Sequence, residues 1–189
     1  MLFTAPPDPV LEHPSDGRKM RVLYSEEQIA ARVGELGREL RAELGPGEIT
    51  LLCVLKGAFM FTADLARAMS GPLHVEFLGV RSYGDETTSS GAVQITHDLT
   101  APIEGKHVVL VEDIVDTGLT VRYLLDTLRA RGPASLRVCT LFERPSAGSP
   151  VRPEHVGFQL QGHEFIVGYG LDWAQRLRNL PYVAEIETR

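Results

Sequence analysis

The chain has 189 residues, of which 43% are hydrophobic and 23% charged, and its formal net charge is −6. This size and composition are typical of one globular domain with its own core, so we expect a single domain over residues 1–189. The acidic balance argues against a nucleic-acid-binding surface across the protein, and no apolar run approaches the roughly 18 residues that a membrane span needs. Cys53 and Cys139 each lie in an apolar run, which favours buried reduced thiols and a cytoplasmic location.

The first half of the chain alternates between predicted helices and strands. Four prolines within the first 14 residues indicate an extended arm over residues 1–22. Ser25 and Gln28 are spaced as a capping box, and Ile29 begins a run of apolar residues at helical spacing. In chain order, the expected elements are a helix over 25–44, a strand over 49–55, a helix over 58–69, and strands over 75–80 and 93–99.

Strands and helices also alternate in the second half. The expected elements are a strand over 108–111, a helix over 121–128, and strands over 136–142, 156–160, 165–169 and 182–186. Such alternation predicts an α/β fold with a central, mainly parallel sheet and helices on both faces. Residues from about 143 to 189 include the extra strands, which we expect to form a small hood over the carboxyl edge of the sheet, where ligands bind in open α/β sheets.

Residues 107–120, with the sequence HVVLVEDIVDTGLT, carry the clearest functional signal. An apolar strand runs directly into Glu112 and Asp113, and a small-residue turn that begins at Asp116 leads into a helix. Backbone N–H groups and the helix dipole at such a turn bind phosphate, while the carboxylates bind hydroxyls or a metal ion. An ordinary strand–turn–helix is the alternative, but three crowded acids repel one another unless a cation lies among them.

This segment resembles the 5-phosphoribosyl 1-pyrophosphate (PRPP) motif of the type I phosphoribosyltransferases, in which a hydrophobic strand precedes two acids, two apolar residues and D-[ST]-G-x-[ST]. Every fixed position of that pattern is present. The resemblance implies a type I phosphoribosyltransferase fold, with Asp116 as the catalytic residue that accepts a proton from, or hydrogen-bonds, the purine N7. It also implies that the 5′-phosphate and ribose of PRPP are held by Glu112, Asp113, Asp116, Thr117, Gly118, Leu119 and Thr120.

A second resemblance, to the hypoxanthine-guanine phosphoribosyltransferases, is carried by residues 156–158, 165–172 and 178–181. It implies that Phe165 stacks on the purine and that the backbone of Ile166 meets the purine edge. It places Asp172 beside the base and in contact with the water shell of Mg²⁺, near which Glu112 and Asp113 also lie. On residue type alone, a core position for Phe165 and a surface pair of Asp172 with Arg178 are the alternatives.

Lys56 and Gly57 follow a strand end, and in the type I family this loop binds pyrophosphate, often through a strained backbone that glycine tolerates. The resemblance adds Arg178 to the pyrophosphate site. It also implies that the polar residues 84–91 form a mobile lid, with Ser82 and Tyr83 at its base. An ordinary turn and an ordinary surface hairpin are the alternatives on composition.

Arg144 is a departure from the family, which places a lysine, often within D-K-P, to donate to the purine 6-oxygen. The segment here is Glu143-Arg144-Pro145, and arginine remains a cationic donor but is a longer planar fork. Arg144 is therefore expected at the base, with contact to Glu143 or to a solvent phosphate as the alternative. Base preference stays open between hypoxanthine or guanine and the alternatives xanthine, adenine or a pyrimidine.

The implied reaction is transfer of the 5-phosphoribosyl group from PRPP to a 6-oxopurine, giving IMP or GMP and pyrophosphate in purine salvage. The resemblance implies Mg²⁺ as cofactor and a homo-oligomer, dimer or tetramer, with no nucleic-acid or membrane partner. A non-catalytic PRPP-sensing regulator is the rival from another class, but such proteins typically add a DNA-binding domain, for which we expect no room ahead of residue 23. A P-loop NTPase is disfavoured because the sequence has no GxxxxGK[ST].

Overall fold

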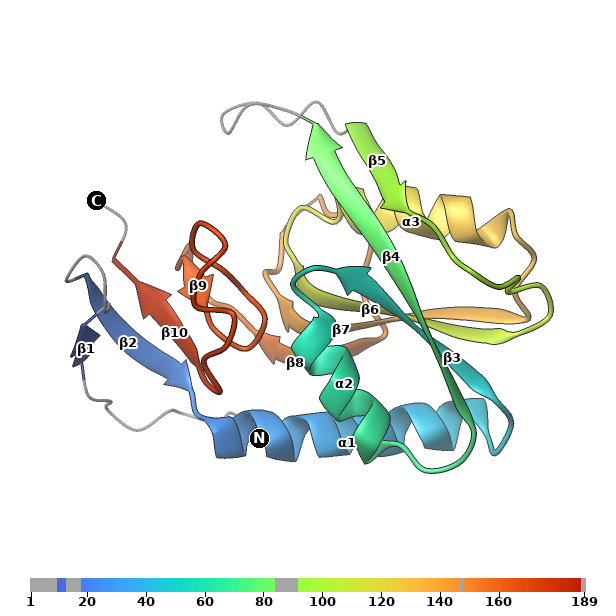
Figure 1. The fold of residues 1–189 in the computed structure, drawn as a ribbon, viewed down its shortest axis with the longest axis horizontal. Coiled ribbons are helices and arrows are strands. Elements are labelled where there is room, and N and C mark those ends of the chain that lie inside the picture. The colour runs from blue at the N-terminus through green and yellow to red at the C-terminus, as the bar shows by residue number, and fades with distance from the viewer. Residues whose placement is uncertain (1–9, 13–17, 84–91, 147, 188–189) are drawn as a thin grey trace.

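A six-stranded sheet forms the centre of the protein, whose computed structural model describes residues 10–12, 18–83, 92–146 and 148–187 (Figure 1). In spatial order its strands are β5 (Ala92–His97), β4 (Leu73–Tyr83), β3 (Ile49–Leu55), β6 (His107–Val115), β7 (Ser135–Glu143) and β8 (His155–Gln159). Parallel pairing joins β4, β3, β6, β7 and β8 in that spatial order, whereas β5 pairs antiparallel with β4. The predicted mainly parallel sheet is confirmed.

Helices cover both faces of this sheet (Figure 1). Leu51 of β3 packs in one core cluster with residues of α1 (Glu26–Leu44) and α2 (Phe59–Ala68). Its neighbour Leu52 packs in a second cluster with residues of α3 (Leu119–Arg129). Because successive side chains of a strand point to opposite faces, a fully apolar strand such as β3 can fill both cores. This explains the unbroken apolar runs of the central strands.

The helix ends follow from local hydrogen bonding. The predicted capping box is confirmed: Gln28 N donates to Ser25 Oγ at 3.4 Å, and Ser25 N donates to Gln28 Oε1 at 2.9 Å. At the start of α3, Gly118 adopts a left-handed φ of +75°, which lets the chain turn sharply out of β6. No described helix is both long and apolar enough to cross a membrane.

A second, four-stranded sheet forms the hood (Figure 1). Its spatial order is β1 (Val10–Glu12), β2 (Lys19–Tyr24), β10 (Val183–Ile186) and β9 (Ile166–Val167), all antiparallel. The hood therefore takes strands from both ends of the described chain. Met20 of β2 is buried in a small cluster with Val167, Ala184 and Ile186, which explains why this part of the expected arm pairs as a strand.

Two details differ from the sequence expectation. Residues 19–22, expected in an extended N-terminal arm, belong to strand β2 of the hood. Strand β8, expected among the extra strands, instead extends the central sheet by pairing with β7. The partner of β2 is β10, which lies far away in the sequence, and the pairing of β8 with β7 is decided by tertiary packing. Hydrophobic periodicity reports neither of these.

Candidate active site

The PRPP-like motif lies at the carboxyl end of β6 and the start of α3. Glu112 and Asp113 are part of β6, and Asp116 and Thr117 are exposed in the turn that follows. The N-cap residue of α3 is Gly118, which offers no side-chain cap, and Leu119 N makes a long hydrogen bond of 3.5 Å to Thr117 Oγ1. The first N–H groups of a helix need an acceptor, and the helix dipole favours an anion there. The turn thus offers a phosphate-binding site.

Glu112 is buried and Asp113 is partly buried, and neither forms an ion pair with another described residue. Among the described residues, Glu112 Oε2 has no hydrogen-bond partner. Burial raises the pKa of Glu112 well above its usual range, and the charge of Asp113 raises it further. Burial also raises the pKa of Asp113 to about 6, against the hydrogen bond that Ile114 N donates to Asp113 Oδ1 at 2.8 Å. A hydroxyl donor or a cation would satisfy this pair.

Gly57 is packed directly against Asp113. A Cβ atom on Gly57 would overlap the Asp113 carboxylate. On its other side, Gly170 has a φ of +101°, and a Cβ atom there would overlap the carbonyl oxygen of Gly57. Three segments therefore meet closely at Gly57: the end of β6 through the Asp113 carboxylate, the loop before α2, and the turn before Asp172. The peptide bond between Leu55 and Lys56, just before this loop, is cis.

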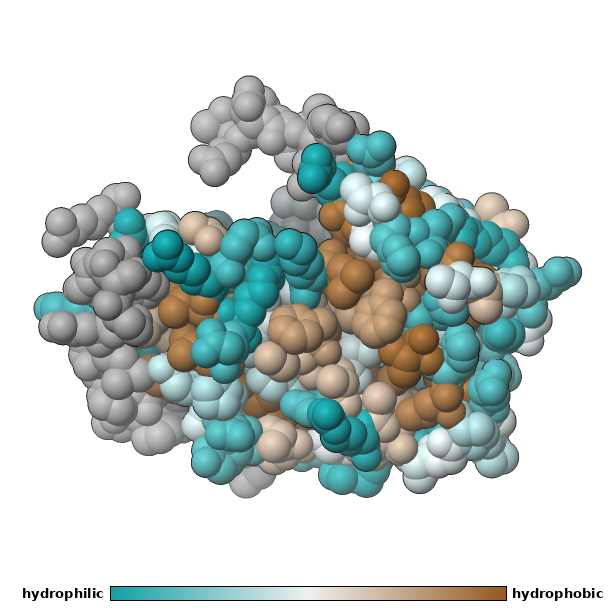
Figure 2. Space-filling view, in the orientation of Figure 1, coloured by the Kyte–Doolittle hydropathy of each residue, from teal (hydrophilic) through white to brown (hydrophobic). Residues whose placement is uncertain are grey.

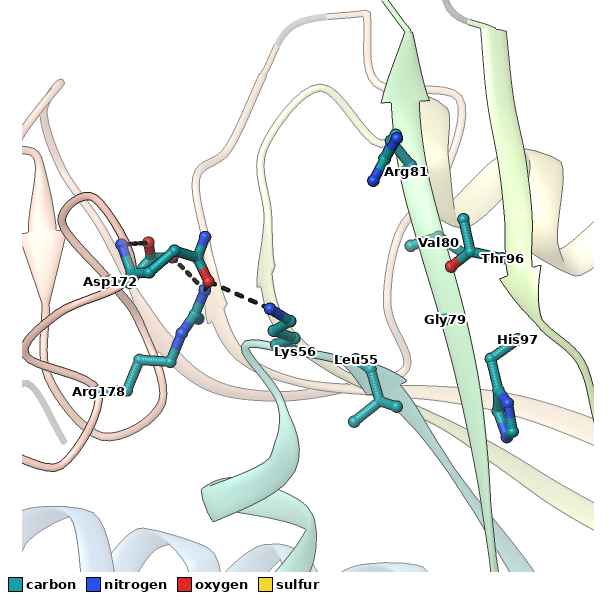
Figure 3. Close-up of a pocket in the computed structure, with 10 residues that line it drawn as sticks. Leu55, Lys56, Gly79, Val80, Arg81, Thr96, His97, Asp172 and Arg178 are labelled. Carbon is teal, nitrogen blue, oxygen red and sulfur yellow. Dashed lines mark hydrogen bonds and ion pairs between the residues drawn. The ribbon is translucent and has the colours of Figure 1, made fainter.

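A cavity of about 660 Å³ opens beside this junction. Lys56, Asp172 and Arg178 line one side, and Arg81, Thr96 and His97 from β4 and β5 line the other (Figure 3). Arg178 Nη2 forms an ion pair with Asp172 Oδ1 at 2.6 Å, and Arg178 Nη1 donates to the carbonyl oxygen of Gly170 at 2.6 Å. The cavity lies between the central sheet and the hood. Cationic side chains are frequent in its lining, which suits a polyanionic ligand.

Asp172 and Arg178 are therefore paired, but at the cavity and not on an outer surface. Asp172 Oδ2 also accepts a hydrogen bond from Gln175 N at 2.7 Å, so both of its oxygens have partners within the hood. Among the described residues, no three His, Cys, Asp or Glu side chains lie close enough together to hold a metal ion by themselves. Mg²⁺ usually keeps several waters and binds through one or two carboxylates and substrate phosphates, so the unpartnered Glu112 and its neighbour suit an ion held together with the substrate.

Arg144 contacts Asp116 instead of Glu143. Its Nη1 donates to Asp116 Oδ2 at 2.7 Å, its Nε to the carbonyl oxygen of Gly162 at 2.8 Å, and its Nη2 to that of Glu164 at 2.8 Å. Only 17% of the Arg144 side chain is exposed. The guanidinium thus joins the turn of the PRPP-like motif to the loop before β9. Phe165 belongs to this loop, so Arg144 helps to hold it in place.

Phe165 is exposed to 44%, so its alternative position in the core is wrong. Its ring meets Trp173 edge to face, with centroids 5.0 Å apart. The Phe165 carbonyl oxygen accepts from Ile186 N at 2.9 Å, and Ile166 pairs with Glu185 of β10. An exposed aromatic ring, anchored next to β9 by this backbone hydrogen bond, can stack on a flat base.

Ser82 and Tyr83, predicted at the base of a lid, are the last residues of strand β4, and the predicted lid over 84–91 lies outside the described residues. Two contacts were not predicted from the sequence. Gln175 lies in the cavity between Lys56 and Arg178. The Tyr169 hydroxyl donates to Asp64 Oδ2 at 2.7 Å and so links the hood to α2. A polar residue inside the short loop between Asp172 and Arg178 was the available signal for Gln175.

Comparison with known proteins identifies the family. Residues 22–173 match the model of the phosphoribosyl transferase domain. The hypoxanthine-guanine phosphoribosyltransferase of Mycobacterium avium is 46% identical over 192 residues, which is 97% of this chain and 93% of the relative. That of Bacillus subtilis is 42% identical over 168 residues, 88% of this chain and 93% of the relative. The crystal structure of a hypoxanthine-guanine phosphoribosyltransferase from Bacillus anthracis has a TM-score of 0.84 at 40% identity and covers 88% of this chain and 98% of that one.

The chain therefore belongs to the phosphoribosyltransferase family and is a phosphoribosyl-transferring enzyme. Within the family it groups with the hypoxanthine-guanine phosphoribosyltransferases, and its reaction is transfer of the phosphoribosyl group of PRPP to a purine base in purine salvage. The family, the fold class with its hood, and the enzyme class predicted from the sequence are all confirmed.

Proposed function

We propose that the purine is a 6-oxopurine, hypoxanthine or guanine, whose nitrogen attacks C1 of PRPP to give IMP or GMP and pyrophosphate. The single observation that carries this is the junction of an acidic strand end, a helix N-terminus whose N-cap residue is glycine, and a cationic cavity. In this reaction positive charge develops on the ribosyl ring while negative charge develops on the leaving pyrophosphate. A site with acids on one side and cations on the other matches both charges.

In this proposal the N-terminus of α3 holds the 5′-phosphate through residues Thr117 to Thr120. Glu112 and Asp113 accept hydrogen bonds from the ribose hydroxyls, which would satisfy the unpartnered Glu112 Oε2. Lys56, Gly57 and Arg178 hold the pyrophosphate in the cavity. Mg²⁺, held with PRPP near Glu112, Asp113 and Asp172, would supply charge neutralisation for the leaving pyrophosphate.

The base lies against Phe165, beside the backbone of Ile166. Asp116 accepts the proton of, or hydrogen-bonds, the purine N7. Three of the five guanidinium N–H groups of Arg144 are used within the protein, on Asp116 and two carbonyl oxygens. In this proposal the remaining N–H groups, which have no partner among the described residues, donate to the purine 6-oxygen, which favours a 6-oxopurine over adenine.

The test is pyrophosphate release by the purified protein with PRPP and Mg²⁺, with hypoxanthine, guanine, xanthine, adenine and uracil supplied separately. We expect release with hypoxanthine or guanine, and loss of release when a chelator removes Mg²⁺. Release only with xanthine, adenine or uracil would overturn the base assignment. PRPP binding without release for any base would favour a PRPP-sensing regulator.

We also infer that the protein is a cytoplasmic homo-oligomer. Cys53 and Cys139 are buried free thiols, which fits a reducing compartment. Val75 and Phe77 of β4 are exposed to 38% and 42%, and apolar residues gather on this face (Figure 2). A related solved structure, of the hypoxanthine phosphoribosyl transferase of Trypanosoma cruzi, was determined in work on its oligomeric state. Light scattering of the wild type and of Phe77→Glu tests this: a fall in mass for the variant is expected, and a monomeric wild type would contradict it.

A further inference from the structure

Gln175 joins the two cations on the hood side of the cavity. Its Oε1 accepts a hydrogen bond from Lys56 Nζ at 3.3 Å and another from Arg178 Nη2 at 3.3 Å. Lys56 belongs to the loop before α2, whereas Arg178 belongs to the hood, so a single amide oxygen joins the two parts of the site. All three residues line the same cavity, in which Lys56 and Arg178 approach each other (Figure 3).

A strained turn holds Gln175 in this position. Trp173 and Arg176 exchange two backbone hydrogen bonds, of 3.1 and 2.9 Å, and the residues between them, Ala174 and Gln175, have φ values of +49° and +66°. Turns with two positive φ values normally carry glycine, asparagine or aspartate. Non-glycine residues persist in this region where the surroundings fix them, and such strain concentrates at ligand sites. Here Asp172 Oδ2 fixes the turn by accepting from Gln175 N.

The chemistry of the amide explains why glutamine suits this place. Lys56 and Arg178 repel each other, and an acceptor between them offsets that repulsion. A second carboxylate here, beside Asp172, which already pairs with Arg178, would remove the net positive charge of the cluster and would then compete with an incoming anion. The amide oxygen of Gln175 is a neutral acceptor, so it fixes the position of both cations without adding negative charge.

We propose that Gln175 is a positioning residue for the pyrophosphate group of PRPP, which keeps Lys56 and Arg178 converged before the substrate arrives. On binding, phosphate oxygens replace the amide oxygen as the acceptor for one or both cations. Side chains that are ordered in advance lose less conformational entropy when the ligand binds. This inference rests on the proposed function, in which Lys56 and Arg178 contact pyrophosphate.

The test compares Gln175→Glu and Gln175→Met with the wild type in the forward reaction, measuring kcat, the KM values for PRPP and hypoxanthine, and inhibition by inorganic pyrophosphate. For Gln175→Glu we expect the KM for PRPP and the inhibition constant for pyrophosphate to rise about tenfold or more, because an ion pair replaces a neutral contact. For Gln175→Met, which keeps the length but loses the acceptor, we expect a rise of about threefold. The KM for hypoxanthine should change by less than about twofold in both variants.

The matched control is Ala174→Glu, which adds the same charge in the same turn at an exposed residue that does not line the cavity. We expect its KM for PRPP to stay within about twofold of the wild type. An equal rise in Ala174→Glu and Gln175→Glu, or an unchanged KM for PRPP in both Gln175 variants, would overturn the proposal. Thermal unfolding of every variant identifies one that fails to fold, in which case Gln175→Met carries the test.

A failure of the proposed function has a different signature. If the wild type releases no pyrophosphate with any base, the kinetic comparison is replaced by calorimetric titration of the wild type and Gln175→Glu with inorganic pyrophosphate. Weaker binding by Gln175→Glu, with Ala174→Glu unchanged, would support the positioning role. Equal binding by all three proteins would overturn it.

Discussion

The guanidinium of Arg144 and the carboxylate of Asp116 form an ion pair of 2.7 Å between Nη1 and Oδ2, across a site whose other wall is made by the hood. Arg144 N also donates to the carbonyl oxygen of Val115 at 2.9 Å, so backbone and side chain both hold the end of β7 against the end of β6. The carboxylate of Asp116 is thereby fixed at Oδ2, while its Oδ1 has no hydrogen-bond partner among the described residues.

The free oxygen predicts the behaviour of Asp116→Asn. The amide keeps the shape of the side chain but cannot accept a proton, so we expect kcat to fall by about 10²- to 10⁴-fold, the range for loss of a general base. The KM for PRPP should change little. Steady-state kinetics with hypoxanthine and PRPP measures both, and an unchanged kcat would exclude this role for Asp116.

Arg144→Lys tests whether the proposed base site depends on the planar guanidinium of Arg144, which donates several hydrogen bonds at once. A single ammonium cannot reach Asp116 Oδ2 and the carbonyl oxygens of Gly162 and Glu164 together, so the loop that carries Phe165 loses support. We expect kcat/KM for hypoxanthine to fall by about tenfold or more, and the KM for PRPP to change less. Arg131→Lys is the control, because Arg131 pairs with Asp98 away from the site. Equal losses for both substrates would speak against a base-specific role.

Gly57→Ala is predicted to damage activity through Asp113. The new Cβ atom would overlap the carboxylate, so Asp113 and the loop before α2 must move apart. A displacement near 1 Å at a reacting site can cost about 100-fold, and we expect a loss of that order in kcat/KM. Gly47→Ala is the matched control because its Cβ atom would have nothing within 4 Å. Wild-type activity in Gly57→Ala would show that this packing is unimportant.

Glu76 predicts a pH dependence of stability. Only 4% of Glu76 is exposed, and its carboxylate accepts from Thr100 N at 3.1 Å, from Thr100 Oγ1 at 2.8 Å and from His74 Nε2 at 3.0 Å. Although burial opposes it, these hydrogen bonds hold the pKa of Glu76 below its usual value. Stability from a carboxylate with a lowered pKa is present above its unfolded pKa, roughly 4.3, and is lost as the pH falls through the folded pKa.

For Glu76→Gln we therefore expect the free energy of unfolding at pH 7 to fall by about 1–3 kcal/mol. The difference from the wild type should narrow as the pH falls below about 4.3, because the wild-type carboxyl then becomes neutral as well. Denaturant unfolding between pH 7 and 3 measures this, with the exposed Glu48→Gln as the control. A difference in the free energy of unfolding between Glu76→Gln and the wild type that stays constant across this pH range would contradict the role given to the Glu76 carboxylate.

The central sheet was predictable because its strands are buried on both faces. Residues 49–55 are apolar enough to mark β3 with the bounds it has in the structure. Strand β4 is longer than the predicted 75–80, since Leu73 pairs with Ile49 and Tyr83 pairs with Ala92. Its ends are held by backbone hydrogen bonds, which leave no hydrophobic pattern in the sequence.

The parts that could not be predicted depend on contacts between distant residues. The motif order placed Glu112 and Asp113 at a strand end, but nothing in residues 107–120 specifies that Gly57 packs on one of these acids. Likewise, several possible acceptors lie near Arg144 in the sequence. Its hydrogen bond to Asp116 follows from how β6 and β7 pair. Periodicity indicates that a residue is buried or exposed, not which partner it meets.

The pairing of Met20 with Ile186 has a consequence for how the site assembles. These residues flank nearly the whole chain, so the hood closes one of the longest loops in the molecule, and contacts of such separation form late in folding. We expect the central sheet to form first and the strands of the hood to pair afterwards. By the same reasoning, amide hydrogens of β2, β9 and β10 should exchange before those of β3 and β6, so the hood can unfold locally while the central core remains folded.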